Sequence, residues 1–181
     1  MAVVLSVFPS DWGWIGLAVS GRGLAGLTLP QMSEADAWDR LYSGWPDGVV
    51  EQADPWPELR RRLLSYLAGE PVDFSDIPLD LPERPSFWRR VWDACARIPY
   101  GERRSYADLA REVGSPRASR AVGGAMAANP IPIVIPCHRV VGSNGQLVGF
   151  GGGLAQKKRM LDMEASNRRG DACIAPTIAI G

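Results

Sequence analysis

The first third of the chain alternates short apolar runs with glycine, serine and aspartate. Residues 3–5, 14–19 and 24–29 are apolar runs of strand length, each bounded by turn-forming residues. The Ser-Gly-Arg-Gly segment at 20–23 is typical of a tight hairpin loop. This pattern predicts a small sheet whose strands are joined by tight turns.

Two later segments have the three- and four-residue spacing of amphipathic helices. Residues 33–41 form the first and residues 57–67 the second, whose leucines share one stripe and whose end is marked by Gly69. Residues 70–85 contain four prolines and cannot form a long helix, which predicts an extended linker. We therefore expect an N-terminal α+β domain over residues 1–80, with the linker reaching about residue 85.

A helix with one apolar stripe opens the second half of the chain. Ser86 is its expected N-cap, and Pro99 follows its end. Cys95 lies on the apolar stripe, which favours a core-filling role for this thiol over a chemical one.

Two shorter helices separated by a tight turn follow. Ser105 and Asp108 are spaced as a capping box, which predicts a helix that begins there and runs to Val113. A glycine breaks it, and Ser115, followed by proline, is the expected N-cap of a second helix over 117–126. This is the spacing of a helix-turn-helix motif, although helix pairs with no nucleic-acid role have it too.

The segment after the helix pair mixes prolines with apolar residues. The three prolines of residues 129–136 forbid a helix while their neighbours demand burial, which predicts an extended, stiff strut that presents Cys137. Residues 140–148 predict a hairpin around an Asn-Gly turn. Residues 149–153, four of them glycine, permit a close approach of the backbone to a ligand.

A last helix is expected over residues 154–164, with Leu154, Leu161 and either Ala155 or the stem of Lys158 turned inward. It closes a C-terminal domain over residues 86–168, and residues 169–181 form a tail with no interpretable pattern.

Composition narrows the class of protein. The chain has 181 residues, 46% of them apolar, which is enough to bury a core in one domain or two small ones. Its start lacks a basic region, and charges or prolines interrupt every later apolar stretch, so we expect a cytoplasmic protein with no membrane partner. Three widely spaced cysteines and one histidine argue against disulfides or a zinc site, so reduced thiols and no metal or cofactor are expected.

The formal net charge of zero hides a division between the two halves. Residues 1–85 hold six arginines against thirteen acids, a charge of −7, whereas residues 86–181 hold fourteen basic against seven acidic residues, a charge of +7. A basic half suits a polyanionic partner such as nucleic acid, because neutralising phosphates releases counterions. An ordinary solvated basic surface is the alternative.

The one histidine of the chain directly follows a cysteine. Cys137 and His138 lie in an Ile-Pro-Cys-His-Arg-Val segment at 135–140. A cysteine becomes strongly nucleophilic only as the thiolate, which a neighbouring base favours, and His138 is the candidate base. A buried structural thiol beside a solvated histidine is the alternative for an isolated Cys-His pair.

The wider context of this pair resembles a known family. Similar segments are the Ser-Tyr at 105–106, the Arg-Ala-Val-Gly-Gly-Ala-Met at 120–126, the Asn-Pro-Ile-Pro at 129–132, the Pro-Cys-His-Arg-Val-Val-Gly at 136–142 and the Gly-Phe-Gly-Gly at 149–152. Together they resemble the alkylguanine-DNA alkyltransferases, the methylguanine methyltransferases of direct-reversal DNA repair. The resemblance covers residues 86–164 closely and the N-terminal half only in its layout.

The resemblance implies a fold and a partner. The fold is α+β, with a small α/β, ribonuclease H-like N-terminal domain before a C-terminal winged helix-turn-helix domain that binds DNA and carries the reaction. The partner is double-stranded DNA containing alkylated guanine, the expected state of the chain is a monomer, and no cofactor is needed.

The implied reaction is stoichiometric and consumes the protein. The alkyl group moves from O6 of a flipped-out guanine to Cys137 and remains there as a thioether. His138 takes the thiol proton through a bound water, and Glu164 orients and stabilises His138. Tyr106 donates its hydroxyl toward guanine N3, and its ring favours flipping.

The resemblance also implies contacts to the nucleic acid. Arg120 fills the gap that the extruded base leaves in the duplex, while Gly123 and Gly124 let their helix lie close to the minor groove. Asn129 braces the strut before the cysteine. The remaining implied contacts are Ser105 and Ala121 for DNA and Val140, Phe150 and Gly151 for the guanine.

This sequence departs from the family pattern at a few positions. The N-terminal half has neither histidine nor cysteine, so the zinc site of some relatives is not expected. Phe150 replaces a frequent tyrosine, which keeps stacking and loses a hydroxyl contact. Gly151 replaces a frequent serine, which leaves only its backbone N–H for O6.

Two other classes of function stay open at this point. A non-enzymatic sensor of alkylated DNA would keep the binding module but carry tryptophan in place of the cysteine, and Cys137 counts against it. A thiol hydrolase could use Cys137 and His138 on a small soluble substrate, but the helix-turn-helix and the basic half would then be coincidences.

Overall fold

The structure, a computed structural model, describes residues 3–45 and 49–171. Cys173 and most of the predicted tail lie outside the described residues. We call residues 3–85 the N-terminal half and residues 86–171 the C-terminal half. In chain order the elements are β1 (Val3–Ser10), β2 (Gly13–Ser20), β3 (Gly23–Leu27), α1 (Glu34–Tyr42), β4 (Val49–Glu51), α2 (Pro57–Leu67), α3 (Ser86–Ala96), β5 (Arg104–Ser105), α4 (Tyr106–Glu112), α5 (Ser119–Ala127), the 3₁₀ turn η1 (Cys137–Arg139), β6 (Val140–Val141) and α6 (Gly153–Asp171).

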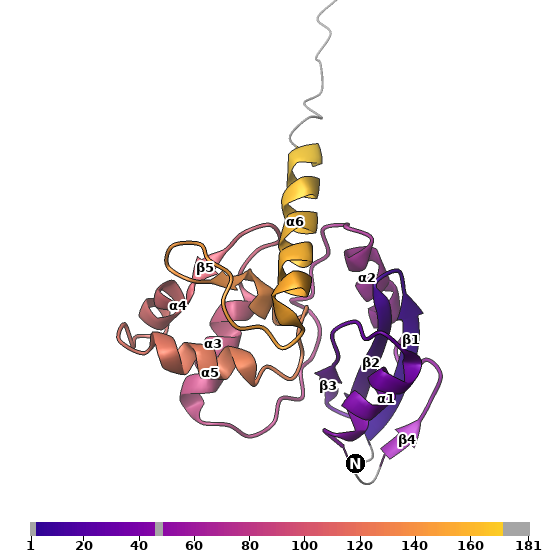
Figure 1. Ribbon diagram of the computed structural model, residues 1–181. Helices are drawn as coiled ribbons and strands as arrows, with labels where there is room; N and C mark the ends of the chain where they lie inside the picture. Colours follow the sequence, from indigo (N-terminus) through magenta and orange to yellow (C-terminus); the bar gives the residue numbers. More distant parts are fainter. Residues whose placement is uncertain (1–2, 46–48, 172–181) are drawn as a thin grey trace, which may run out of the picture.

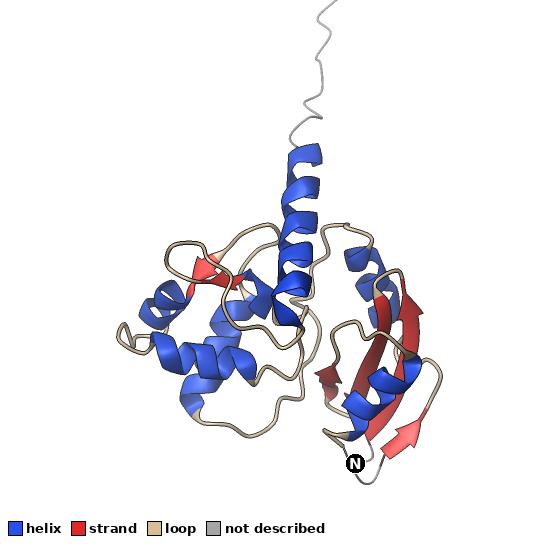
Figure 2. Ribbon diagram, in the orientation of Figure 1, coloured by secondary structure: helices blue, strands red, loops and turns tan. Residues whose placement is uncertain are grey.

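The N-terminal half is built on one twisted sheet (Figure 2). The strand order is β3-β2-β1-β4, with β1 antiparallel to β2, β2 antiparallel to β3, and β4 parallel to β1. The predicted hairpin at 20–23 is confirmed, because Ser20 pairs with Gly23 across a two-residue turn. The sequence did not reveal β4, which has three residues and is too short to show a period.

Each face of the sheet packs against a different part of the molecule. Leu5 and Ala18, which are register partners, lie in a small buried cluster with Leu41 of α1. Phe8 and Ile15, also register partners, face the opposite way into the main core with α2. Strand residues alternate between faces, so one sheet supports both layers.

In the C-terminal half α3, α4 and α5 pack against one another, and β5 and β6 form a short parallel pair beside them (Figure 2). The indole N–H of Trp92 in α3 donates to the carbonyl of Ala125 in α5 at 2.8 Å, which ties these helices together. Cys95 is fully buried in the core, in agreement with its predicted filling role.

The helix pair differs from prediction at the start of its second helix. The capping box of the first helix is confirmed, since Ser105 Oγ accepts from Asp108 N at 3.0 Å and Asp108 Oδ2 accepts from Ser105 N at 2.8 Å. The predicted N-cap at Ser115 is wrong, because α5 begins only at Ser119. The Ser115 N–H instead continues the end of α4 by donating to Ala110 O, so the turn between the helices is longer than the serine-proline signal indicated.

The predicted hairpin over residues 140–148 is also wrong. Val140 and Val141 pair in parallel with Arg104 and Ser105, and residues 147–148 form no strand. Only the local Asn-Gly turn forms, with Gly142 N–H donating to Gln146 O at 2.8 Å. The longer-range pairing with β5 satisfies the valine backbone in place of a hairpin partner.

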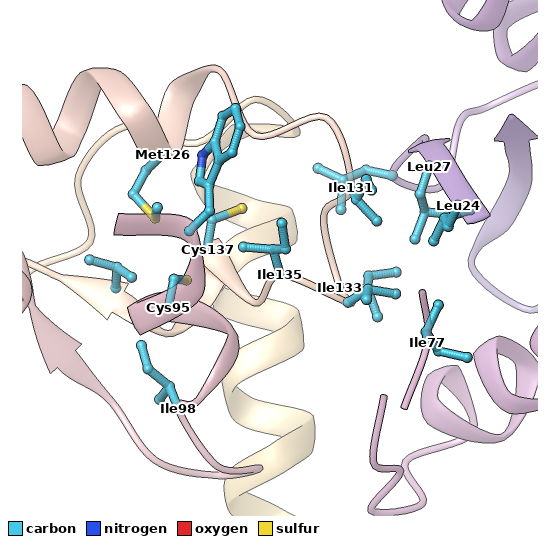
Figure 3. Packing of buried hydrophobic residues seen from close by; sticks show 14 of the residues in the cluster. Leu24, Leu27, Ile77, Cys95, Ile98, Met126, Ile131, Ile133, Ile135 and Cys137 are labelled. Atoms are coloured by element: carbon cyan, nitrogen blue, oxygen red, sulfur yellow. The ribbon is translucent and has the colours of Figure 1, made fainter. Parts of the chain in front are cut away.

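The proline-rich segment 129–136 is folded back on itself, so the prediction of an extended strut is wrong. Its middle residue Ile133 has φ 74°, and the N–H of Ile135 donates to Ile131 O at 2.9 Å. A buried backbone must satisfy its polar groups, and this segment does so through its own turn and through Pro130 O, which accepts from Leu27 N of β3 at 3.0 Å. Ile131, Ile133 and Ile135 extend from the Cys137 side toward Leu24 and Leu27 of the N-terminal half (Figure 3).

Helix α6 lies over the junction of the two halves (Figure 1). Gln156 Nε2 donates to Pro30 O at 3.2 Å, and the Arg159 guanidinium lies 3.7 Å from the centroid of the Trp12 ring. The predicted inward orientation is correct for Leu161 and wrong for Leu154, whose exposed fraction is 48%. It is also wrong for the two alternatives Ala155 and Lys158, which are both exposed. The buried stripe instead begins with a lysine, as described below.

No helix within the described ranges is long and apolar enough to cross a bilayer.

Three serines were predicted as N-caps, and Ser86 is not one, because it is the first residue of α3 and Pro85 precedes it as the N-cap. The other two provide a stability test of the observed helix starts. We expect Ser105→Ala to lower the free energy of unfolding by about 1 kcal/mol, because it removes a cap that accepts the Asp108 N–H. Ser115→Ala serves as the control and should change it by less than about 0.5 kcal/mol, since this side chain caps no helix. Urea unfolding of both variants measures the difference, and equal losses would contradict the observed start of α5.

Candidate functional site

Cys137 lies at the bottom of a cavity of about 530 Å³. Its N–H donates to Ile135 O at 2.7 Å across Pro136, whose φ of −78° and ψ of 63° make an inverse γ-turn. This tight turn leads into η1, and only 7% of Cys137 is exposed. The walls of the cavity are Tyr106, Ser119, Gly123, Met126, Ala127, Val148, Gly149, Phe150 and Gly151.

The Cys137 thiol is protonated at rest. Burial raises its pKa, while the Asn129 amide, the Lys157 charge and the backbone N–H groups of Cys137 and His138 act in the opposite direction. The net shift is upward, so the thiolate is scarce at neutral pH. A nucleophilic reaction of this sulfur therefore needs a partner that accepts its proton.

His138 is such an acceptor. Its ring is fully buried, and burial lowers its pKa even though Glu164 acts in the opposite direction, so the imidazole is neutral. Nε2 lies 2.8 Å from Glu164 Oε1, and Nδ1 is buried without a hydrogen-bond partner in the described part of the chain. Because an ionised carboxylate can only accept, Nε2 carries the hydrogen and Nδ1 keeps its lone pair.

Glu164 is a fully buried carboxylate surrounded by donors. Arg139 contributes Nε to Oε2 at 3.0 Å and Nη2 to Oε1 at 3.0 Å, and the Gly101 N–H donates to Oε2 at 3.0 Å. Burial alone would raise the pKa of Glu164, but hydrogen bonds from His138 and the charge of Arg139 lower it to about 2. The group is therefore ionised at neutral pH.

The aromatic walls of the cavity are placed by a buried lysine. Lys157 Nζ donates to Val140 O at 2.7 Å and to Val148 O at 3.0 Å. The same ammonium lies 5.8 Å from the ring centroids of both Tyr106 and Phe150. The Tyr106 hydroxyl also donates to Val148 O, at 3.2 Å, so two donors hold this one carbonyl of the loop after residue 147.

The sequence-predicted residues fall into three groups in space. Tyr106, Gly123, Phe150 and Gly151 line the cavity with Cys137. His138 and Glu164 lie behind it in the interior. The third group does not line this cavity, because its members lie on the outer surface or support the cavity from outside: Ser105, Arg120, Ala121, Gly124, Asn129 and Val140.

The exposed side of α5 carries small residues and one arginine. Arg120, Ala121 and Gly124 are exposed, and a Cβ placed at Gly124 would have no neighbour within 4 Å. Helix packing within this chain therefore does not require glycine at position 124.

Asn129 supports the segment that carries the cysteine. Its Nδ2 donates to Ile135 O at 2.8 Å, and its Oδ1 accepts from Ile131 N at 3.0 Å. It also borders a second cavity of about 430 Å³ that reaches Cys137 from the side of the N-terminal half. Among the residues that the structure describes, no three His, Cys, Asp or Glu side chains gather where a metal ion could bind.

Comparison with known proteins finds clear relatives of this chain. Residues 86–166 match the family model described as 6-O-methylguanine DNA methyltransferase, DNA binding domain. A methylated-DNA–protein-cysteine methyltransferase of Haemophilus influenzae is 48% identical over 166 residues, which covers 90% of this chain and 87% of the relative. One from Methanosarcina acetivorans is 47% identical over 121 residues, which covers 67% of this chain and 76% of the relative.

The chain belongs to the methylated-DNA–protein-cysteine methyltransferase family. Among solved structures, Mycobacterium tuberculosis OGT in complex with DNA has a TM-score of 0.76 and 38% identity, covering 91% of this chain and 94% of that one. The O6-methylguanine-DNA methyltransferase of Pyrococcus kodakaraensis has a TM-score of 0.69 and 26% identity, covering 88% and 98%. The predicted resemblance and the predicted α+β fold class are confirmed.

Three residues beside the cavity and the buried carboxylate were not predicted from the sequence. Tyr66, Arg139 and Lys157 are all buried polar groups that contact Glu164, His138 or the cavity walls. Tyr66 shares its helical stripe with core leucines, and this spacing could have placed it inside the protein. No sequence signal distinguishes the buried Lys157 from its exposed neighbour Lys158.

The buried charge of Glu164 predicts a stability loss on neutralisation. Glu164→Gln should lower the free energy of unfolding by about 3–5 kcal/mol, because it leaves Arg139 buried without its counter-ion. Glu112→Gln is the control, since it breaks the exposed pair with Arg97 and should cost less than about 1 kcal/mol.

The stability difference between the parent and Glu164→Gln should depend on pH. The pKa of Glu164 is lower in the folded chain than the ordinary 4.5, so its stabilisation is present above about pH 4.5 and is lost as the pH falls toward about 2. Urea unfolding at several pH values should show the gap between parent and Glu164→Gln shrinking over this range. A gap that stays constant would contradict an ionised Glu164.

Proposed function

We propose that this chain repairs DNA by moving an alkyl group from O6 of guanine in a duplex to the sulfur of Cys137, once per molecule. The observation that carries the proposal is a thiol at the bottom of a cavity, backed by a neutral histidine whose Nδ1 is free to accept a proton. The names of the family members describe this type of transfer.

The chemical step balances without a cofactor. The Cys137 thiol loses its proton, through a bridging water, to His138 Nδ1, and the sulfur attacks the alkyl carbon. The bond between that carbon and O6 breaks, and its electron pair leaves with guanine, which is protonated as it departs. The products are an S-alkylcysteine and an ordinary guanine. A thioether is a poor leaving group, so the protein is consumed.

Tyr106 is the proposed donor to the leaving guanine. It is half-buried in the cavity wall, and burial raises the pKa of its phenol, so the proton is present at neutral pH. Phe150 offers a ring for stacking, and the backbone N–H of Gly151 remains for O6. The second cavity beside Cys137 provides room for the alkyl substituent.

The exposed side of α5 is the proposed DNA contact. Its small residues permit a close approach to a groove, and Arg120 is the side chain long enough to replace a flipped base. Ser105, Ala121, Gly123 and Gly124 would border the same groove. The charge of +7 on residues 86–181 supports phosphate binding.

A reaction that needs a reduced thiol also favours the cytoplasm as the compartment.

Stoichiometric transfer to one cysteine tests the proposal directly. Duplex with a labelled methyl on guanine O6 should label the parent to one equivalent, and peptide mass analysis should find the adduct on Cys137. Cys137→Ser should abolish transfer yet keep affinity for the duplex, because docking and flipping use other residues. Cys95→Ala is the matched control and should keep transfer, since Cys95 is a core residue outside the cavity lining.

Two outcomes would contradict this assignment. An adduct mainly on Cys95 would place the chemistry at the wrong sulfur. Sustained turnover without an added thiol would favour the hydrolase alternative.

Arg120 should affect the rate of repair only in a duplex, where the flipped base leaves a gap that its side chain can fill. We expect Arg120→Ala to slow single-turnover repair of duplex about tenfold or more while sparing reaction with a free O6-alkylguanine base, because an inserted side chain offsets part of the flipping cost of a few kcal/mol. Arg117→Ala removes an equally exposed positive charge from the preceding turn and serves as the control. Equal losses on both substrates would show that Arg120 is not the inserted residue.

A further inference from the structure

Tyr66 brings a group from the N-terminal half into the proton relay. It lies on α2, is fully buried, and is 72 and 98 residues away in sequence from the two residues that it contacts. Its hydroxyl oxygen is 2.8 Å from Glu164 Oε1 and 3.1 Å from His138 Nε2. The alkyl transfer described above assigns no role to this hydroxyl.

The direction of each hydrogen bond follows from the protonation states. Glu164 is ionised and only accepts, so the Tyr66 O–H donates to it. Burial and the Glu164 charge raise the pKa of Tyr66, which keeps the phenol protonated. The single phenol proton is then committed to Glu164. The Tyr66 oxygen therefore faces His138 Nε2 as an acceptor.

We infer that Tyr66 is a positioning residue that holds His138 in the tautomer with hydrogen on Nε2, so that Nδ1 stays available for the Cys137 proton. Both neighbours of Nε2, the carboxylate and the phenol oxygen, then accept from the same N–H. The opposite tautomer would set an Nε2 lone pair against two oxygen acceptors and would place a hydrogen on the nitrogen that has to act as base. The importance of this role for repair rests on the proposed function.

The ring of Tyr66 is held independently of its hydroxyl. The rings of Phe74 and Tyr100 lie edge-on to it, each with its centroid 6.1 Å away. Tyr66→Phe should therefore keep the packing and remove only the oxygen. Without that oxygen the Nε2 hydrogen loses one of its two acceptors, and the second tautomer becomes more populated.

The single histidine of the chain makes the tautomer directly measurable. An untagged protein labelled with ¹⁵N-histidine gives nitrogen signals from the His138 ring alone. At neutral pH the parent should show a protonated Nε2 and an unprotonated Nδ1, and Tyr66→Phe should shift both signals toward a mixture of tautomers. Tyr42→Phe is the matched control, because it also removes a phenol that donates to a glutamate, Glu51, and it should leave the spectrum unchanged.

Kinetics then connect the tautomer with repair. Tyr66→Phe should slow single-turnover methyl transfer about tenfold, the effect of losing one hydrogen bond to a charged group. Its affinity for alkylated duplex should equal that of the parent, because Tyr66 lies in the interior. Tyr42→Phe should match the parent in both measurements.

The outcomes of these experiments distinguish the proposed role of Tyr66 from its alternatives. A parent spectrum with hydrogen on Nδ1 overturns the inference without any variant, so it remains testable even if Tyr66→Phe does not fold. A slower Tyr66→Phe with an unchanged nitrogen signature also overturns it, since the tyrosine would then act only through packing. If the parent transfers no methyl group but its spectra behave as expected, the proposed function fails and the assignment of the tautomer stands.

Discussion

Glu164 holds a full negative charge in the interior, and the groups around it are arranged to keep that charge there. Arg139 neutralises it, the Gly101 N–H satisfies Oε2, and Tyr66 with His138 satisfies Oε1. A buried charge is tolerated only when its partners are close and directed. The same requirement gives His138 a fixed orientation and leaves one ring nitrogen free, so a condition for stability also prepares a proton acceptor.

The two halves meet where this chemistry is located. Segment 129–136 packs its isoleucines against the strands of the N-terminal half and leads into Cys137 (Figure 3). Helix α6 carries Glu164 and Lys157 and contacts the N-terminal half through Gln156. The fold thus places the nucleophile and its relay on segments that are held from two sides. Rigid placement of this kind suits a reaction that occurs once and needs no product release from the sulfur.

Some local signals in the sequence were reliable, but one local signal and the longer-range ones were not. The capping box at Ser105 and the 20–23 turn formed as predicted, because each depends on residues a few positions apart. The predicted N-cap at Ser115 failed because the Ser115 N–H instead donates to Ala110 O at the end of α4, a local alternative. The hairpin over 140–148 failed because a tertiary contact, the pairing with β5, gave Val140 and Val141 another partner. The inward side of α6 was misjudged because its buried stripe carries charged residues, whose burial depends on partners elsewhere in the chain.

The sequence by itself determined the family, the α+β class and the pairing of a cysteine with a histidine, since these depend on residue identity and short spacing. Only the tertiary structure decided which nitrogen of His138 is free, that Arg139 and Tyr66 share Glu164, and that Lys157 rather than Lys158 enters the interior. Such assignments depend on where hydrogen-bond acceptors lie in space. When a hydrogen-bond acceptor is tens of residues away along the chain, the sequence around the donor shows no pattern that reveals it.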